Sequence, residues 1–177
     1  MSEPEFRPER MLRVLGAHGV RFVLIGGFAA VIHGSPYVTT DIDVVPKGGG
    51  ENLERLSDAL KAMHARVWTA SEPGGVPFDH GAAALGEVLV WNLVTDFGRL
   101  DVTFEPAGTS GYDDLASGAI DLEILGAHVE VASLADIVRS KEAADRDRDR
   151  LVLPVLRRLL SADADQADPA SREHRPL

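Results

Sequence analysis

The fold is decided by residues 22–45, which read FVLIGGFAAVIHGSPYVTTDIDVV. The apolar run at 22–25 is rich in β-forming residues and stops at Gly26-Gly27, which predicts a buried strand followed by a tight turn. The small, apolar residues 28–32 predict a buried helix, and the run at 41–45 predicts a second strand. This part of the chain should therefore form a strand, a turn, a helix and another strand.

Further elements are expected on both sides of this stretch. Apolar residues at helical spacing predict helices over 8–18 and 51–64. The segment 71–86 is rich in Gly, Pro and Ala, which indicates an irregular connection, and both tryptophans, Trp68 and Trp91, are expected in the core. Apolar, β-rich runs predict two antiparallel pairs, 87–94 with 99–104 and 121–125 with 128–131.

The last third of the chain is expected to be helical. Ser133, with Asp136 three residues later, predicts the start of a helix with a capping box. A final helical segment is expected over 151–160, broken or kinked at Pro154. Residues 161–177 are small, polar and Pro-containing, which predicts a disordered tail. We therefore expect one domain over 1–160, with an α/β (α+β) fold in which helices pack on a small mixed sheet.

The composition limits the classes of function. A net charge of −10 argues against a protein whose whole surface binds nucleic acid. Between 139 and 158, however, seven basic residues stand against four acidic ones, and this is the one strip of the sequence that would attract phosphate. The same residues are equally typical of a solvated helix with exposed ion pairs.

Two absences in the sequence lead to further expectations. There is no cysteine, so a metal would need oxygen or histidine ligands. No run approaches the roughly 20 apolar residues of a membrane span, and the first residues lack the layout of a secretory signal. We expect a cytoplasmic protein with no membrane association.

Three aspartates are the main candidates for chemistry. Asp41 and Asp43 are two residues apart on a predicted strand, so both carboxylates should project from the same face while Ile42 and Val44 point to the core. Such a pair repels unless a cation lies between its members, and hard divalent ions such as Mg²⁺ or Mn²⁺ prefer oxygen ligands. Asp101 also lies between apolar neighbours, and a neighbouring strand would bring it to the pair as a third metal ligand and catalytic residue.

A phosphate site is expected beside these carboxylates. Gly26 and Gly27 open a helix directly after a strand, where backbone N–H groups can face an anion without a side chain between them. The hydroxyls of Ser35, Thr39 and Thr40 come just before the carboxylate pair and would add hydrogen bonds to a phosphate.

These motifs together match a family pattern. Ile25-Gly26-Gly27, thirteen further residues, Asp41-Ile42-Asp43-Val44 and the downstream Leu100-Asp101-Val102 resemble the signature of the DNA polymerase β-like nucleotidyltransferase superfamily. The segment 33–43 looks most like the small AbiEii-type nucleotidyltransferase toxins of type IV toxin–antitoxin systems, and the segment 140–149 is similar to the Lys-containing helix and basic-Asp element that often close such domains. The resemblance covers roughly residues 22–160.

The resemblance implies transfer of a nucleoside monophosphate from an NTP to a hydroxyl, with release of pyrophosphate. Asp41 and Asp43 would hold the metals, Asp101 would help to activate the acceptor, and Lys141 would neutralise the triphosphate. The acceptor is left open among an RNA end, a protein hydroxyl and a small molecule, and a cognate partner protein is implied. The chain departs from the family pattern at Tyr37, where an Arg is expected.

The Asp-x-Asp motif allows two other interpretations. Phosphatases of the haloacid dehalogenase type also carry an Asp-x-Asp motif, but there the motif should end an apolar strand, whereas here Thr39-Thr40 precede it and the apolar run follows. The stronger alternative is a non-catalytic member of the nucleotidyltransferase fold that serves as a binding or regulatory module. Tyr37 favours this alternative, and the three aspartates oppose it.

Overall fold

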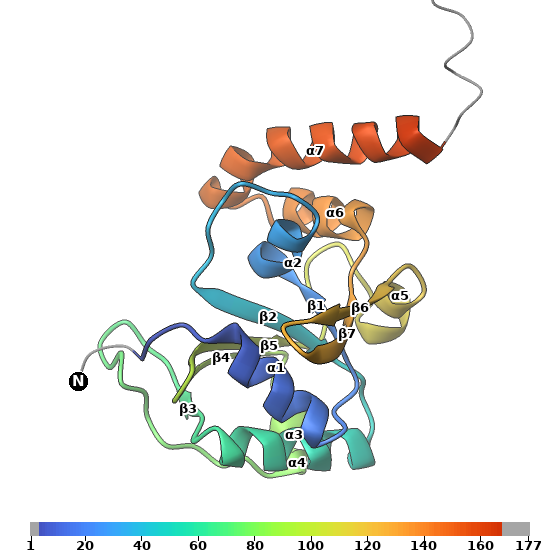
Figure 1. Ribbon diagram of the computed structural model, residues 1–177. Helices are drawn as coiled ribbons and strands as arrows, with labels where there is room; N and C mark the ends of the chain where they lie inside the picture. The colour runs from blue at the N-terminus through green and yellow to red at the C-terminus, as the bar shows by residue number, and fades with distance from the viewer. Residues whose placement is uncertain (1–3, 168–177) are drawn as a thin grey trace, which may run out of the picture.

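The computed structural model describes residues 4–167, which form a mixed sheet with helices on both sides (Figure 1). Within these residues the sheet has seven strands in the order β3-β4-β5-β2-β1-β7-β6. The strands are β1 Phe22–Ile25, β2 Asp41–Pro46, β3 Arg66–Val67, β4 Val90–Thr95, β5 Gly98–Thr103, β6 Ile120–Ile124 and β7 Ala127–Val131. The predicted α/β class, a mixed sheet with helices packed on it, is confirmed.

The helices lie in two layers. Figure 1 shows α1, α3 and α4 on one side of the sheet and α2, α6 and α7 on the other. Their bounds are α1 Pro8–Ala17, α2 Gly26–Ile32, α3 Gly50–Ala62, α4 Ala82–Gly86, α5 Tyr112–Ala116, α6 Leu134–Ala144 and α7 Asp147–Ala167. No helix in the described range 4–167 combines the length and the apolar character that a membrane crossing requires.

The strand register explains how the site is built. The central strands β1 and β2 are antiparallel, whereas β2 pairs in parallel with β5. Along β2 the side chains alternate: Ile42 and Val44 are buried in the core, while Asp41 and Asp43 are half-buried on the other face. The face that carries the two aspartates is the one covered by α2, α6 and α7 (Figure 1).

Several sequence expectations are confirmed at the level of contacts. Ser133 caps the start of α6 as predicted, because the backbone N–H of Asp136 donates to Ser133 Oγ at 3.1 Å. The return bond of the predicted capping box takes a different form, since the Asp136 carboxylate accepts from the Ser133 hydroxyl at 2.7 Å. The two antiparallel pairs are β4 with β5 and β6 with β7.

Other expectations need correction. The segment 71–86 is not wholly irregular, because its end forms the short helix α4, anchored by the buried Leu85. Both tryptophans are only partly buried. Trp91 packs against the core, and the Trp68 ring is covered by an arginine. Pro154 does not interrupt α7.

The first residues of the predicted disordered tail are helical. Helix α7 continues past Ser161 to Ala167, so residues 161–167 are helical, and Ser161 Oγ donates to the Arg157 carbonyl at 3.0 Å one turn earlier. Alanines at 162 and 164 favour this continuation. The rest of the predicted tail, 168–177, lies outside the described residues.

Candidate active site

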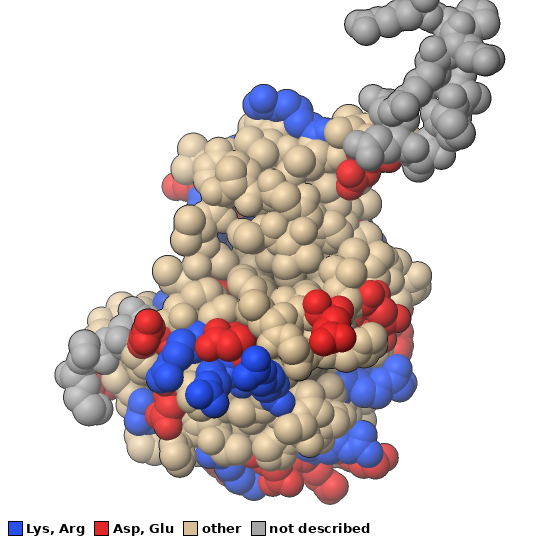
Figure 2. Space-filling view, viewed as in Figure 1, with Lys and Arg blue, Asp and Glu red and all other residues tan. Residues whose placement is uncertain are grey.

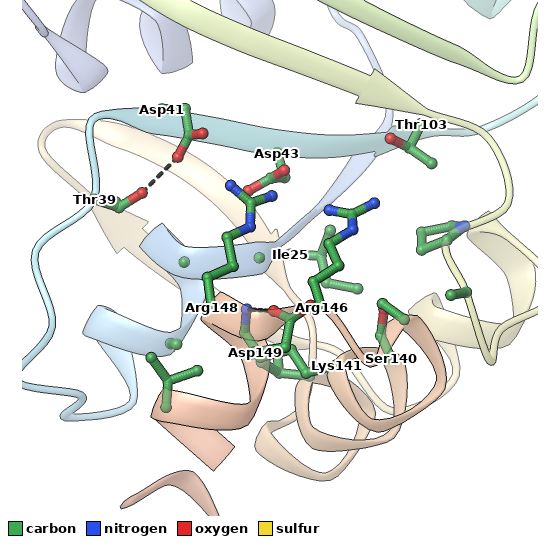
Figure 3. Close-up of a pocket in the computed structure, with 18 of the residues that line it drawn as sticks. Ile25, Thr39, Asp41, Asp43, Thr103, Ser140, Lys141, Arg146, Arg148 and Asp149 are labelled. Atoms are coloured by element: carbon green, nitrogen blue, oxygen red, sulfur yellow. Dashed lines mark hydrogen bonds and ion pairs between the residues drawn. The ribbon is translucent and has the colours of Figure 1, made fainter.

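The paired carboxylates of β2 line a cavity of about 450 Å³ between the sheet and the α6–α7 pair. Asp41 and Asp43 project into it from neighbouring positions on one strand face, as the alternation predicts (Figure 3). Thr39 Oγ1 donates a hydrogen bond to Asp41 Oδ1 at 2.5 Å and so orients that carboxylate. All six residues predicted to bind the nucleotide also line the cavity, namely Gly26, Gly27, Ser35, Thr39, Thr40 and Lys141.

Asp101 lies beside this pair but outside the cavity wall. It is the direct neighbour of Asp43 in the parallel pairing of β2 and β5, which places both side chains on the same face of the sheet. Its carboxylate is 13% exposed and lies 3.8 Å from Arg99 Nη2. The strand register therefore brings the third aspartate next to the other two, although it does not line the same cavity as they do.

Burial and mutual repulsion make two of these carboxylates weak acids. Burial, followed by the charges of Asp41 and Asp101, raises the pKa of Asp43 from 3.8 to about 7, against the lowering effect of Lys141 and Arg148. Burial also raises the pKa of Asp101 to about 6, and Arg99 opposes this shift. A site in which carboxylates hold their protons near neutral pH favours any cation that replaces the proton.

The glycine pair makes room for these side chains. A Cβ atom on Gly26 would lie 1.9 Å from Asp43 Oδ2, and the residue has a φ of +75°, which side chains rarely adopt. A Cβ on Gly27 would lie 2.9 Å from Thr39 Oγ1. The two glycines thus let Asp43 and Thr39 pack directly on the start of α2. Their predicted contact with a phosphate stays a prediction.

Lys141 is a built-in cation of the cavity and not an exposed helix charge. Its Nζ donates to Asp149 Oδ1 at 2.9 Å, and the two side chains are only 17% and 4% exposed. The pair joins α6 to α7 at the wall opposite the aspartates, as Figure 3 shows. A buried charge pair of this kind fixes the position of the ammonium group within the cavity.

Two further arginines enter the cavity from the junction of α6 and α7. Arg146 and Arg148 both line it, and Figure 3 shows their guanidinium groups pointing toward Asp43 and Thr103. Among residues 4–167 neither side chain makes a hydrogen bond or ion pair, whereas the neighbouring Arg150 is paired with Asp145. The basic strip of the sequence pointed to this segment, but only the fold shows that these two arginines face the carboxylates.

The residues of the cavity could supply part of the ligands of a divalent ion, with substrate phosphates supplying the others. No group of three or more His, Asp or Glu side chains in the described part of the chain is arranged as a ready ligand set. Asp41 and Asp43 supply two neighbouring carboxylates that face the cavity. Mg²⁺ is typically bound by one or two carboxylates together with substrate phosphates and water. The structure also adds Thr103 and Glu105 to the cavity wall, two residues that the sequence patterns did not single out.

Comparison with solved structures shows a likeness in fold. No protein-family model and no curated protein matches the sequence. Among solved structures, the chain is similar to a proposed nucleotidyltransferase from Thermotoga maritima, with 17% sequence identity and a TM-score of 0.49 over 90% of this chain and 97% of the other.

Proposed function

We propose that this chain is a metal-dependent nucleotidyltransferase that moves a nucleoside monophosphate from an NTP to a hydroxyl acceptor and releases pyrophosphate. One observation carries the proposal: a single cavity holds the paired carboxylates of Asp41 and Asp43 on one wall and Lys141, Arg146 and Arg148 on another. Carboxylates that bind divalent ions, set opposite cations that bind phosphates, are the parts that phosphoryl transfer requires. The sequence resemblance to the DNA polymerase β-like superfamily supports the same activity.

Each group has a distinct part in the proposed reaction. Asp41 and Asp43 would hold Mg²⁺ or Mn²⁺, which when bound would polarise the phosphates and the attacking oxygen. Lys141, Arg146 and Arg148 would bind the non-reacting phosphates and stabilise the negative charge of the departing pyrophosphate. Asp101, beside Asp43 on the next strand, would accept the proton of the acceptor hydroxyl.

We also propose a biological setting for this activity. The likeness of residues 33–43 and 140–149 to AbiEii-type toxins supports a role in a toxin–antitoxin pair, with a cognate partner protein. Since Asp101 lies beside the cavity and not in its wall, the acceptor would approach from the β5 side of the sheet.

A second candidate function is a non-catalytic module that binds nucleotide in the same cavity. Two observations favour it: Tyr37 stands where the family pattern has an Arg, and Asp101 does not line the cavity. Such a module would bind an NTP through the same cations without transferring it.

Transfer of label separates the two candidates. The purified chain is incubated with each α-³²P-labelled NTP, Mg²⁺ and separate RNA, protein and small-molecule fractions of a cell extract. The proposed enzyme labels one fraction and releases pyrophosphate, and the Asp41→Ala/Asp43→Ala variant does neither. Tight NTP binding without label in any fraction would favour the non-catalytic module.

A further inference from the structure

A cluster of unsatisfied polar groups lies next to the aspartates, outside the cavity described above. In the described part of the chain, five buried side-chain nitrogen or oxygen atoms lack a hydrogen-bond partner: Arg7 Nε, Arg66 Nε, Trp68 Nε1, Arg99 Nε and Asp101 Oδ1. Buried polar atoms are nearly always paired in folded proteins, so such a concentration calls for a partner that the chain alone does not supply.

The strand register places most of these groups together. Arg66, Val94 and Arg99 are successive neighbours across β3, β4 and β5, and the next neighbour of Arg99 is Asp41 of β2. Residues paired across strands project to the same face of a sheet. The two arginines therefore stand on the face that carries the aspartates, on the β3–β4 side of them.

Trp68 and Asp101 complete the cluster. The guanidinium carbon of Arg99 lies 3.8 Å from the centroid of the Trp68 ring, and Arg99 Nη2 lies 3.8 Å from Asp101 Oδ1. Charge-assisted hydrogen bonds are shorter, at roughly 2.7–2.9 Å, so the ion pair leaves the donors of Arg99 largely unused. Within residues 4–167, Arg66 makes no side-chain hydrogen bond or ion pair at all.

Neighbouring parts of the chain fix the positions of the side chains in this cluster. The loop that follows β3 folds back over it, since a Cβ on Gly75 would lie 2.5 Å from Arg66 Cβ and 2.6 Å from Val94 Cγ1. The stack on Trp68 fixes the plane of the Arg99 guanidinium, which reduces the entropy lost when it binds a ligand. A fourth donor, Arg7 Nε, belongs to a residue whose backbone is hydrogen-bonded at the turn before β5.

We propose that Arg66, Trp68 and Arg99 form an anion-binding subsite for a phosphate group carried by the acceptor. The identification of the ligand as the acceptor rests on the proposed transferase activity, because the subsite adjoins Asp101. Two guanidinium groups and an indole N–H supply donors from separate side chains, which suits an anion with three free oxygens better than a carboxylate with two. Small phosphorylated compounds and polynucleotides both carry such a phosphate, and the test separates these two sources.

Binding of phosphate probes tests the subsite without any need for turnover. In a Trp91→Phe variant Trp68 is the single tryptophan, and its fluorescence is followed during titration with inorganic phosphate, a nucleoside monophosphate, a short oligonucleotide and acetate. Calorimetry on the unchanged chain repeats each titration. We expect saturable binding of the phosphate probes, no comparable binding of acetate, and an affinity weakened about tenfold or more by Arg66→Gln or Arg99→Gln. Arg10→Gln, which removes an exposed arginine of α1, should have no effect.

The relative affinities of the probes indicate which kind of acceptor carries the phosphate. Binding of the oligonucleotide at least about tenfold tighter than of the smaller probes indicates a polynucleotide acceptor, and equal affinities indicate a small phosphorylated one. Absence of binding, equal binding of acetate, or binding unchanged by both Arg variants would overturn the subsite. The same variants are titrated with Mg²⁺-ATP, whose affinity should stay at the level of the unchanged chain; failure of ATP to bind any form would count against the transferase and leave the phosphate result standing.

Discussion

At the scale of single residues, the proposed metal site needs a charged Asp43 carboxylate, although the surroundings of Asp43 favour its neutral form. Burial and two neighbouring carboxylates raise its pKa to about 7, while Gly26 packs directly against its oxygens. The folded protein alone therefore stores an unfavourable interaction, and a bound cation would relieve it.

The raised pKa of Asp43 predicts how the stability of the folded protein changes with pH. The folded protein keeps the Asp43 proton where the unfolded chain has released it, so the contribution of this group to stability is complete below pH 3.8 and is lost as pH rises through about 7. Asp43→Asn removes that loss. Without metal at pH 8 the variant should be more stable by on the order of 2 kcal/mol, and near pH 4 the two proteins should be equal.

Chemical denaturation at both pH values measures this difference, with the exposed Asp58→Asn as control. Added Mg²⁺ should raise the unfolding temperature of the unchanged protein at pH 8 and should not do so for Asp43→Asn. A variant that is less stable at pH 8 would contradict the assignment of repulsion at this position.

Gly26 offers a second test at the same scale. Gly26→Ala introduces a Cβ at 1.9 Å from Asp43 Oδ2 and forces a side chain into a φ of +75°. The free energy of unfolding should fall by about 2 kcal/mol or more, and Mg²⁺-dependent nucleotide binding should be lost because the carboxylate is displaced. Gly48 has no atom within 4 Å of its would-be Cβ, so Gly48→Ala serves as the matched control and should change neither quantity. Equal behaviour of both variants in denaturation would show that the close packing on Asp43 is unimportant.

At the scale of elements, the connection of α6 to α7 brings the cations to the cavity. Lys141 of α6 is paired with Asp149 of α7, and Arg146 and Arg148 lie at the junction between the helices. Asp145 ends α6 in the left-handed conformation with a φ of +48°, which turns the chain sharply before α7 begins. The junction thus sets three cations opposite the aspartates of β2.

The buried Lys141–Asp149 pair predicts a separation of stability from binding. Lys141→Met leaves the Asp149 carboxylate buried without a partner and should cost about 3–5 kcal/mol of unfolding free energy. The double variant Lys141→Met/Asp149→Leu removes both charges and should recover most of that loss. NTP affinity, measured by calorimetry, should be reduced in both variants. A double variant as unstable as the single one would show that the pair is not the source of the loss.

The extent of what the sequence predicts follows from how local each signal is. The strand–turn–helix opening could be predicted because the apolar run and the Gly-Gly pair that ends it lie within a few residues. The shared face of Asp41 and Asp43 could be predicted because side chains alternate along a strand. The short elements β3, α4 and α5 were missed, because their two to five residues are held mainly by contacts made elsewhere in the fold. Asp43 and Asp101 are far apart in the chain. The sequence suggested that they lie close together, but only the pairing register of β2 with β5 shows that they are direct neighbours. For the same reason, the roles proposed for Arg146, Arg148 and the Arg66–Trp68–Arg99 cluster could be inferred only from the structure.

At the scale of the whole molecule, charge is distributed unevenly. The chain carries a net charge of −10, and Figure 2 shows acidic and basic side chains interspersed on one face. The cavity differs from this surface because it sets a cationic wall against an anionic one. A molecule repelling polyanions overall can still bind a triphosphate there, since a metal ion offsets part of the ligand charge.

Nucleotide binding by the complete chain tests the central claim most directly. Each of the four NTPs is titrated calorimetrically into the protein with and without Mg²⁺, beside the Asp41→Ala/Asp43→Ala variant. The proposed site predicts saturable binding of at least one NTP that requires Mg²⁺ and disappears in the variant. Absence of binding for all four NTPs, or binding that is unchanged when both aspartates are removed, would contradict it.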